Sequence, residues 1–297
     1  MPMKPIVILD LEWNGTYSKR LKGFINEIIE FGAVKVDDNL QLADTFSLLV
    51  RPQVGKKISG KIATLTNITD EELESGRQFM QVVSRFRKWA GDCILMTWGT
   101  SDILTLIENC RYFSGSDRIP FLTDYVDLQA YCEKCMVYDK GKQVGLSTAA
   151  QLLGIDEESF DHHRALDDSL LSLKCLQKLY SSEELQNFVQ DATVQEFYDR
   201  MEFRTVILCD LENPLLQDAD MSFVCPVCGA SAQKTSEWFL HNKSFRAAFR
   251  CSACGKKFYG RVQFKLKYEG LSVRKTAHLA EEKPEAENLE QESSRSV

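Results

Sequence analysis

The stretch PIVILDLEW, residues 5–13, determines how the first part of the chain folds. The apolar, β-branched run from Ile6 to Leu11 predicts a buried strand, and two acids, Asp10 and Glu12, stand at its end. Side chains at positions i and i+2 of a strand leave the same face of a sheet, so both carboxylates lie side by side. For an isolated pair, two solvated acids at a strand end are the ordinary explanation.

The residues that follow predict a mixed α/β domain ending near residue 180. The expected strands after the first are residues 28–36, 45–50 and 93–98, and the expected helices are residues 69–90, 104–113, 128–137, 147–153 and 165–180. Three strands followed by alternating helices and strands are typical of a sheet flanked by helices. We see no internal repeat.

Two further acids follow predicted strand or loop ends. Asp102 lies just beyond the strand 93–98 and the turn Gly99-Thr100-Ser101, where a helix cap is its ordinary role. Asp168 lies in the segment HHRALDDS, residues 162–169, which leads into a helix. Four carboxylates at one sheet edge suit Mg²⁺ or Mn²⁺. Two such ions about 3.5 to 4 Å apart stabilise in-line displacement at phosphorus, and a neutral histidine nearby can take a proton from water.

These motifs closely resemble those of the DEDDh exonucleases, the DnaQ-like branch of the RNase H-like fold. The resemblance rests on Asp10-Leu11-Glu12, on the block WGTSD at residues 98–102, and on His163 with Asp168, and it covers about residues 4–180. It implies an RNase H-like mixed sheet flanked by helices. It also implies that Asp10, Glu12, Asp102 and Asp168 are the metal ligands and His163 is the general base. The family spacing selects His163 and Asp168 over their neighbours His162 and Asp167.

The resemblance also implies where substrate binds. Residues 64–69, TLTNIT, resemble the family segment that touches the 3′-terminal nucleotide, which makes Leu65, Thr66 and Asn67 candidate contacts. Asn67 stands where the family usually has glycine, and asparagine tolerates a left-handed backbone. Trp13 is a candidate for stacking on a base, with a place in the core as the alternative. The Glu-Trp pair and the Trp-Gly block look most like the Eri-like subgroup, whose members process RNA 3′ ends.

A second motif set lies behind this domain. Two C-x-x-C pairs about twenty residues apart, Cys225 with Cys228 and Cys251 with Cys254, have the spacing of a Cys₄ zinc ribbon. A glycine follows each pair and helps the backbone turn. Four thiolates leave no open coordination position, so this zinc is structural. The alternatives are disulfides or inert buried thiols, and the further C-x-x-C at Cys132 reads as a coincidence of helical sequence.

The charge is distributed unevenly along the chain. Of 297 residues with a net charge of −7, residues 225–275 carry 11 Lys/Arg against 2 acids, whereas the tail 276–297 carries 6 Glu against 2 basic residues. In the basic stretch, cations are interleaved with phenylalanines. In one interpretation the phenylalanines form the small core of the ribbon and the cations are solvated at its surface. In the other, the cations form a face that binds a nucleic-acid backbone. We favour nucleic-acid contact, with a protein partner through the ribbon as the alternative. The cations meant are Lys243, Arg246, Arg250, Lys256, Lys257, Arg261, Lys265 and Lys267, and the phenylalanines are Phe245, Phe249, Phe258 and Phe264.

The expected organisation is a DEDDh exonuclease domain over 1–180, a connector over 181–220, a zinc-ribbon module over 221–270 and a disordered acidic tail over 271–297. No apolar run reaches the length of a membrane span, and the scattered cysteines favour a reducing, cytoplasmic compartment.

The resemblance implies a two-metal 3′-5′ exonuclease acting on single-stranded 3′ ends, with RNA favoured over DNA and nucleoside 5′-monophosphates as products. The alternatives are a DNA exonuclease in repair or proofreading, and a non-catalytic adaptor that binds nucleic acid or protein.

Overall fold

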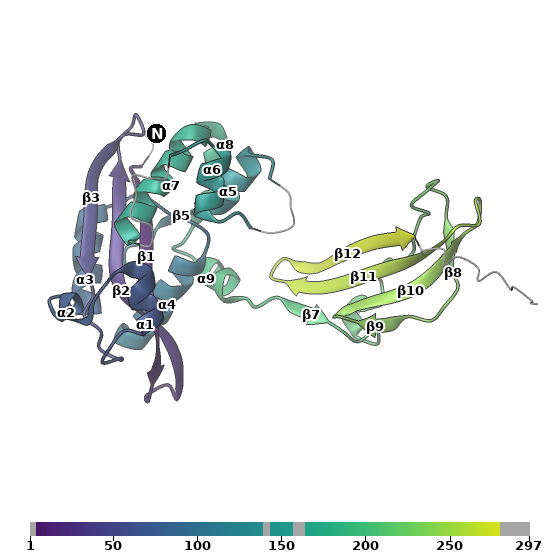
Figure 1. Ribbon diagram of the computed structural model, residues 1–297, viewed down its shortest axis with the longest axis horizontal. Coiled ribbons are helices and arrows are strands. Elements are labelled where there is room, and N and C mark those ends of the chain that lie inside the picture. The colour runs from purple at the N-terminus through teal and green to yellow at the C-terminus, as the bar shows by residue number, and fades with distance from the viewer. Residues whose placement is uncertain (1–3, 139–142, 157–163, 280–297) are drawn as a thin grey trace, which may run out of the picture. The chain divides into compact units, whose positions relative to one another are not determined.

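The computed structural model describes residues 4–138, 143–156 and 164–279. They form two compact units, Met1–Glu202 and Phe203–Val297, and each has its own sheet and its own core. Figure 1 shows both units along the chain, from purple at the N-terminus to yellow near the C-terminus. Each unit is described by itself below.

The first unit is built on a six-stranded mixed sheet in the order β3-β2-β1-β4-β5-β6. The pairs β1/β2, β2/β3 and β5/β6 are antiparallel, and β1/β4 and β4/β5 are parallel. The strands are β1 (Ile6–Ser18), β2 (Gly23–Val36), β3 (Leu42–Leu49), β4 (Ile94–Thr97), β5 (Asp124–Asp127) and β6 (Gln190–Asp191).

Helices cover both faces of this sheet (Figure 1). Odd-numbered β1 residues such as Val7 and Leu9 pack in one core with α3 and α4, and even-numbered ones such as Ile6 and Ile8 pack in a second core with α5, α6 and α7. The helices are α1 (Gly60–Thr66), α2 (Asp70–Glu74), α3 (Phe79–Ala90), α4 (Ser101–Ser114), α5 (Leu128–Cys135), α6 (Leu146–Leu152), α7 (Ala165–Leu179), α8 (Ser182–Gln186) and α9 (Gln195–Glu202). This is the mixed, helix-flanked α/β sheet that the sequence predicted.

Several elements differ from the sequence prediction in extent. The single helix expected over 69–90 is two helices, because a bridge between Val50 and Arg77 interrupts it. At Gly76, between them, a Cβ would come within 2.8 Å of the Arg51 nitrogen. Strand β5 was not predicted, since its four residues, DYVD, are too short and too acidic to give a strand pattern.

The second unit is a β module whose sheet runs in the order β12-β11-β10-β8, with β7 paired to β11 and β9 paired to β10. Its elements are β7 (Val206–Leu208), a 3₁₀ turn (Pro214–Leu216), β8 (Ala232–Lys234), β9 (Phe239–His241), β10 (Ser244–Cys251), β11 (Lys257–Lys267) and β12 (Gly270–Leu279). The four phenylalanines that the sequence singled out, Phe245, Phe249, Phe258 and Phe264, are all buried in its core.

Two parts of the predicted organisation look different in the structure. The stretch expected as a connector is divided: α8 and α9 belong to the first unit, and β7 belongs to the second. Residues 270–279, expected in part as a disordered tail, form β12, which pairs with β11 along its full length. Leu271, Val273 and Ala277, which alternate with polar residues, give the stretch its strand pattern. Residues 280–297 lie outside the described part of the chain, and no helix in that part is long and apolar enough to span a membrane.

Candidate active site and cysteine cluster

Asp10 and Glu12 lie near the middle of β1, on the face that α7 covers. They are paired across the strands with Gly32 and Glu30 of β2, and the register shifts directly after Glu12. The extra residue of this β-bulge is Ile29 of β2. Trp13, by ordinary strand alternation, points to the other face of the sheet, where it is partly buried.

The start of α7 brings Asp168 to the same place. The helix begins at Ala165 almost in contact with β2: a Cβ added at Gly32 would lie 2.0 Å from the Leu166 nitrogen and 2.1 Å from the Ala165 carbonyl carbon. The Ser169 hydroxyl donates a hydrogen bond of 2.9 Å to the Gly32 carbonyl. Only glycine permits this approach, so Gly32 fixes the height of Asp168 above the sheet.

A buried ion pair holds the same helix end in register. The Glu30 carboxylate is 1% exposed and accepts a hydrogen bond of 2.7 Å from Arg164 Nη2. Its second oxygen accepts from the Ala165 backbone N–H at 3.2 Å. Glu30 therefore binds both the last residue before α7 and the first residue in it. It lies directly opposite Glu12 on the neighbouring strand. Sequence reasoning missed Glu30 and Gly32, although an acid and a glycine inside the apolar run IIEFGAV are unusual for a buried strand.

Asp102 lies in the first turn of α4 and is 4% exposed. Its Oδ1 accepts a hydrogen bond of 3.0 Å from the Leu11 backbone N–H, between the two acids of β1. The turn before it is held by the Gly99 carbonyl, which accepts from the Tyr125 hydroxyl at 2.9 Å. Asp102 thus touches β1 directly, in addition to standing at a helix N-terminus.

The three carboxylates of Asp10, Glu12 and Asp168 each offer an oxygen, and these oxygens lie within 4.8 Å of one another. Burial, and then the charges of Asp102 and Asp168, raise the pKa of Asp10 well above its usual range. Burial, and then the charge of Asp168, raise the pKa of Glu12 to about 8. Burial likewise raises the pKa of Asp102 to about 7. Such mutual repulsion is relieved by a cation, and an all-oxygen donor set fits a hard divalent one.

The residues expected to contact substrate are partly accessible. Leu65, at the end of α1, is 43% exposed, and Asn67 has the left-handed backbone that its sequence position required, with φ of 59°. Thr66 is buried, and its hydroxyl donates to the Ile62 carbonyl within the helix. His163, the expected general base, lies outside the described residues.

Two buried polar residues that the sequence did not single out anchor the chain between β3 and α1. The Glu27 carboxylate of β2 accepts hydrogen bonds from the backbone N–H groups of Val54 at 2.8 Å and Gly55 at 2.9 Å. The Asn14 side chain of β1 accepts from the Ser59 N–H at 3.0 Å, just before α1 begins. The strand that carries Asp10 and Glu12 therefore also positions the helix that carries Leu65.

In the second unit, Cys225, Cys228, Cys251 and Cys254 form a compact cluster with their sulfur atoms within 4.8 Å of one another. The Sγ–Sγ distances include 3.6 Å for Cys225 and Cys254 and 3.5 Å for Cys228 and Cys251. Tetrahedral Zn–S bonds of about 2.3 Å place sulfurs roughly 3.8 Å apart, so the cluster has the size that zinc requires. The Cys254 N–H donates to Cys251 Sγ, and this bond lowers the pKa of the Cys251 thiol to about 6.

The second unit thus contains the zinc-sized cluster, whereas the oxygen cluster belongs to the first. A helix-flanked mixed sheet that gathers carboxylates from β1, α4 and α7 defines a nuclease of the RNase H-like class. Residues 7–176 match the RNase_T family, which is described as an exonuclease family. This match covers more than half of the chain, so the chain belongs to that family, and the protein is a 3′-5′ exonuclease.

Curated relatives agree with this assignment. KapD of Bacillus subtilis, described as a probable 3′-5′ exonuclease, is 28% identical over 207 residues, which are 68% of this chain and 97% of KapD. The PolC-type DNA polymerase III of Thermotoga maritima is 27% identical over 205 residues, which are 65% of this chain but 14% of the polymerase. The second relative is therefore similar in one segment only.

Solved structures share the fold of the first unit. The nuclease domain of 3′hExo, described as a DEDDh family member bound to rAMP, has a TM-score of 0.53 at 23% identity, over 64% of this chain and 98% of that one. A 3′-exonuclease described as recognising the 3′ end of a histone mRNA stem-loop has a TM-score of 0.51 at 20% identity, over 64% of this chain and 85% of that one. These likenesses establish a DEDDh-type fold, and enzymes of that type use divalent metals.

Proposed function

We propose that this exonuclease removes nucleotides from single-stranded 3′ ends, with RNA as its preferred substrate. The observation that carries this proposal is the gathering of Asp10, Glu12 and Asp168 oxygens within 4.8 Å on the scaffold of this family. These residues and Asp102 are the proposed ligands of two Mg²⁺ or Mn²⁺ ions. His163 is the proposed base.

Bound divalent ions would stabilise the attacking and leaving oxygens of the displacement at phosphorus. The chain's own residues do the rest. Glu30 and Gly32 hold the start of α7 against β2, so the Asp168 carboxylate is fixed relative to those of β1. Asp102, bonded to the Leu11 N–H, keeps that strand from moving away from α4. His163 would accept the proton of the attacking water, whose oxygen bonds to the terminal phosphorus. The bond from phosphorus to the 3′ oxygen of the preceding nucleotide would break, that oxygen would take a proton from solvent, and a nucleoside 5′-monophosphate would leave.

For the terminal nucleotide we propose Leu65 and Trp13 as side-chain contacts. Leu65 has the exposure for an apolar contact with a base or sugar, and Trp13 is partly buried. Thr66 and Asn67 support the segment from within, Thr66 by its bond to Ile62 and Asn67 by ending α1 in a left-handed conformation. If these four residues bind the 3′-terminal nucleotide, cleavage proceeds in the 3′-to-5′ direction.

The preference for RNA rests on the Glu-Trp and Trp-Gly motifs of the sequence. DNA exonuclease activity in repair or proofreading is the second candidate, because the similar segment of PolC belongs to a DNA polymerase. We further propose one structural zinc in the Cys₄ cluster. No disulfide joins any two of the ten cysteines, all of which lie among the described residues, and this fits a cytoplasmic location.

The test compares 5′-labelled single-stranded RNA and DNA of one sequence, with Mg²⁺, with Mn²⁺ or with no added divalent ion. The parent is expected to shorten RNA from its 3′ end in a metal-dependent ladder, and the Asp10→Asn variant is expected to lose at least about a thousandfold in rate. Asp38→Asn, at an exposed turn far from the carboxylates, is the matched control and keeps the parent rate. Faster shortening of DNA than of RNA would show that DNA is the preferred substrate. No shortening of either polymer by folded, zinc-loaded protein would refute the proposal.

A further inference from the structure

One face of the sheet in the second unit is not used by its core. Side chains alternate along β10 and β11: Phe245 and every second residue to Cys251, and Phe258 and every second residue to Phe264, lie on the core side, and the residues at the intervening positions point to the other side. On that other side, cross-strand pairing aligns Phe239, Arg246, Arg261 and Thr276 in one row across β9, β10, β11 and β12. Tyr259 and His278 form a neighbouring row, and Gln263 and Arg274 a third. We call this surface the arginine face.

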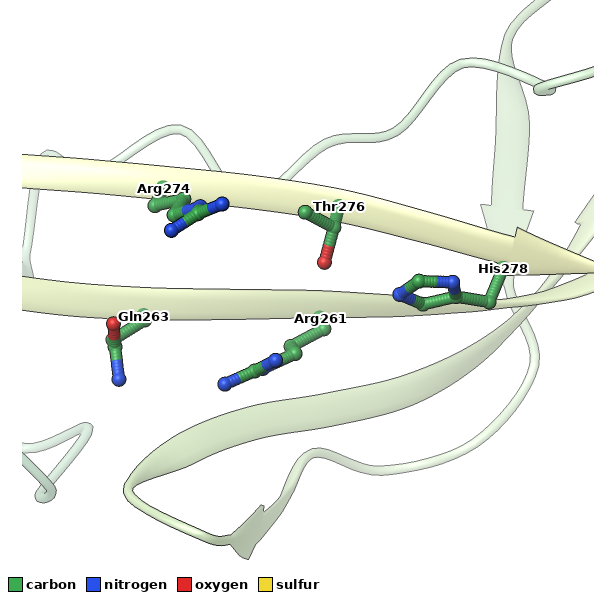
Figure 2. A pocket seen from close by; sticks show the side chains of 5 residues that line it. All are labelled: Arg261, Gln263, Arg274, Thr276 and His278. Atoms are coloured by element: carbon green, nitrogen blue, oxygen red, sulfur yellow. The ribbon is translucent and has the colours of Figure 1, made fainter. Parts of the chain in front are cut away.

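The arginine face is hollowed. Arg261, Gln263, Arg274, Thr276 and His278 line a cavity of about 250 Å³. Figure 2 shows that these five side chains come from two neighbouring strands and extend to the same side of them. A second cavity, of about 400 Å³, is lined by Phe239, Arg246, Tyr259, Arg261 and His278. Arg261 and His278 belong to both linings, so the two cavities are neighbours on this face, and together we call them the groove.

The charges of this groove are not balanced within the described residues. Arg246 stands directly opposite Arg261 in the β10/β11 pair, an arrangement in which like charges repel. None of the residues that line either cavity is acidic. The ion pairs found in the described part of the chain include none with Arg246, Arg261 or Arg274. The arginine face therefore concentrates positive charge that does not stabilise the folded state.

Two polar atoms in the groove also have no partner. Arg246 Nε and Thr276 Oγ1 are buried and make no hydrogen bond in the structure. Both lie in the row that contains Arg261, one strand to either side of it. A buried donor without a partner is costly to the folded state, which indicates that a ligand completes the hydrogen bonds of this row. The ligand must supply acceptors and negative charge.

Aromatic rings lie beside these cations. Tyr259 and Phe239 are each 49% exposed, although both lie on a sheet whose other phenylalanines are fully buried. Phe239 pairs across the strands with Arg246, and Tyr259 precedes Arg261 at the neighbouring outward position of β11. Exposed rings between guanidinium groups suit a chain that alternates flat bases with phosphates. An acidic peptide would use the arginines but not the rings.

We propose that the arginine face binds single-stranded nucleic acid, with phosphates at Arg246, Arg261 and Arg274 and bases against Tyr259 and Phe239. The choice of nucleic acid among anionic polymers rests on the proposed function of the first unit. The face lies in the other unit and contains none of the residues of the carboxylate cluster. It is a second binding site, which holds a part of the strand other than its reacting end.

The test measures binding and not cleavage, by fluorescence anisotropy of a 5′-labelled single-stranded RNA with the full-length, zinc-loaded chain. All proteins carry Asp10→Asn, and a gel checks that the RNA stays intact. The double variant Arg246→Gln/Arg261→Gln is expected to bind at least about tenfold more weakly. It should also lower the slope of log K against log salt by about 1.4, since each lost contact to a single strand removes about 0.7. Tyr259→Ala is expected to weaken binding about fivefold or more without changing that slope.

The matched control is Arg204→Gln/Lys234→Gln, which removes two charges from the same unit. Lys234 stands opposite the inward-pointing Phe249, so it belongs to the other face of the sheet, and Arg204 precedes β7. This control is expected to leave the salt slope unchanged. Circular dichroism and zinc content verify folding, and if the double variant fails to fold, the exposed Arg274→Gln takes its place with an expected change in slope of about 0.7.

Equal affinity and equal salt slope for the parent, the double variant and the control would overturn the proposal. So would tighter binding of a labelled poly-glutamate peptide than of the RNA, with the same loss on changing the arginines and no effect of Tyr259→Ala. The two proposals fail separately. If the parent with Asp10 intact cleaves RNA in the cleavage assay but the double variant loses no binding, the binding site alone is refuted. If the double variant loses binding but the parent with Asp10 intact does not cleave, the exonuclease proposal alone is refuted.

Discussion

At the scale of single residues, Gly32 decides whether the carboxylate cluster can form. We expect Gly32→Ala to force Ala165 and Leu166 away from β2, because the new Cβ meets backbone atoms that cannot rotate aside. The displaced Asp168 should lower kcat about a hundredfold, and overpacking should cost about 1 to 3 kcal/mol of unfolding free energy. Single-turnover cleavage and urea unfolding measure the two effects.

Gly60→Ala is the matched control for that substitution. Gly60 is the first residue of α1, and a Cβ there has no neighbour within 4 Å. The control should keep the parent rate and be equally stable or slightly more stable. Activity of Gly32→Ala equal to that of Gly60→Ala would show that α7 does not depend on this close approach.

Most of the cluster was predictable from the sequence, and the parts that were not have a physical reason. Asp10, Glu12 and Asp168 were expected to lie together because acids after an apolar strand run and at a helix start form local patterns, and their oxygens do lie within 4.8 Å of one another. The first strand continues past both acids to Ser18, which the sequence did not predict. Glu30 and Gly32 act through a contact with residues 164–169, more than a hundred positions away along the chain, which no local pattern reveals. Their one signal is an acid and a glycine within an otherwise apolar strand.

Glu12 makes stability depend on pH in the absence of divalent ions. Its pKa is about 8 in the folded chain against an ordinary value of 4.5, so between these pH values the folded state holds a proton that the unfolded state has lost. This contribution to stability is fully present below pH 4.5 and is lost as pH rises to about 8. Glu12→Gln removes that loss, so its unfolding free energy relative to the parent should increase with pH across this window.

Urea unfolding at a series of pH values, with zinc retained and no Mg²⁺ added, measures this difference. Addition of Mg²⁺ should stabilise the parent more at pH 8 than at pH 5, because a cation binds the deprotonated carboxylates. A difference between variant and parent that does not change with pH would contradict the assignment of the raised pKa to Glu12.

At the scale of elements, α7 depends on an ion pair made by the residue just before it, Arg164. Glu30→Gln keeps the hydrogen bond to the Ala165 N–H but leaves Arg164 without its charge partner. Since Arg164 is about one-third exposed, we expect a loss of about 1 to 3 kcal/mol, below the cost of a fully buried pair. The Mg²⁺ concentration needed for half-maximal cleavage should rise as the start of the helix loosens.

A double-mutant cycle separates the pair from its surroundings. Glu30→Gln/Arg164→Gln should lose less than the sum of the two single variants, because each single change leaves one charge unpaired. Glu183→Gln, exposed in α8, is the control for charge removal. Strict additivity in the cycle would show that the two side chains do not stabilise α7 together.

The elements with a strong local pattern were predicted and the others were not. The strands that begin at Ile6 and Ile94 start with continuous apolar runs, and such runs predict buried strands from the sequence alone. The break between α2 and α3 depends on the pairing of Val50 with Arg77, and β5 depends on its place beside β4. Tertiary pairing of this kind overrides local propensity.

At the scale of the whole molecule, two units with separate cores should unfold in two transitions. Cys228→Ser removes one thiolate from the Cys₄ cluster and should abolish zinc retention and shift the transition of the second unit alone. Calorimetry combined with zinc analysis measures both. Cys209→Ser, an exposed cysteine of the same unit outside the cluster, is the control and should retain zinc. Loss of both transitions in Cys228→Ser would show that the units do not fold separately.

The carboxylate cluster joins the two ends of the family region, since Asp10 and Glu12 lie near its beginning and Asp168 near its end. During translation β1 leaves the ribosome long before α7 exists, and no contact between neighbours in sequence can assemble the cluster in advance. A nascent chain, or one released before residue 165, carries only part of the set. The proposed metal site is therefore incomplete until the whole first unit has been made.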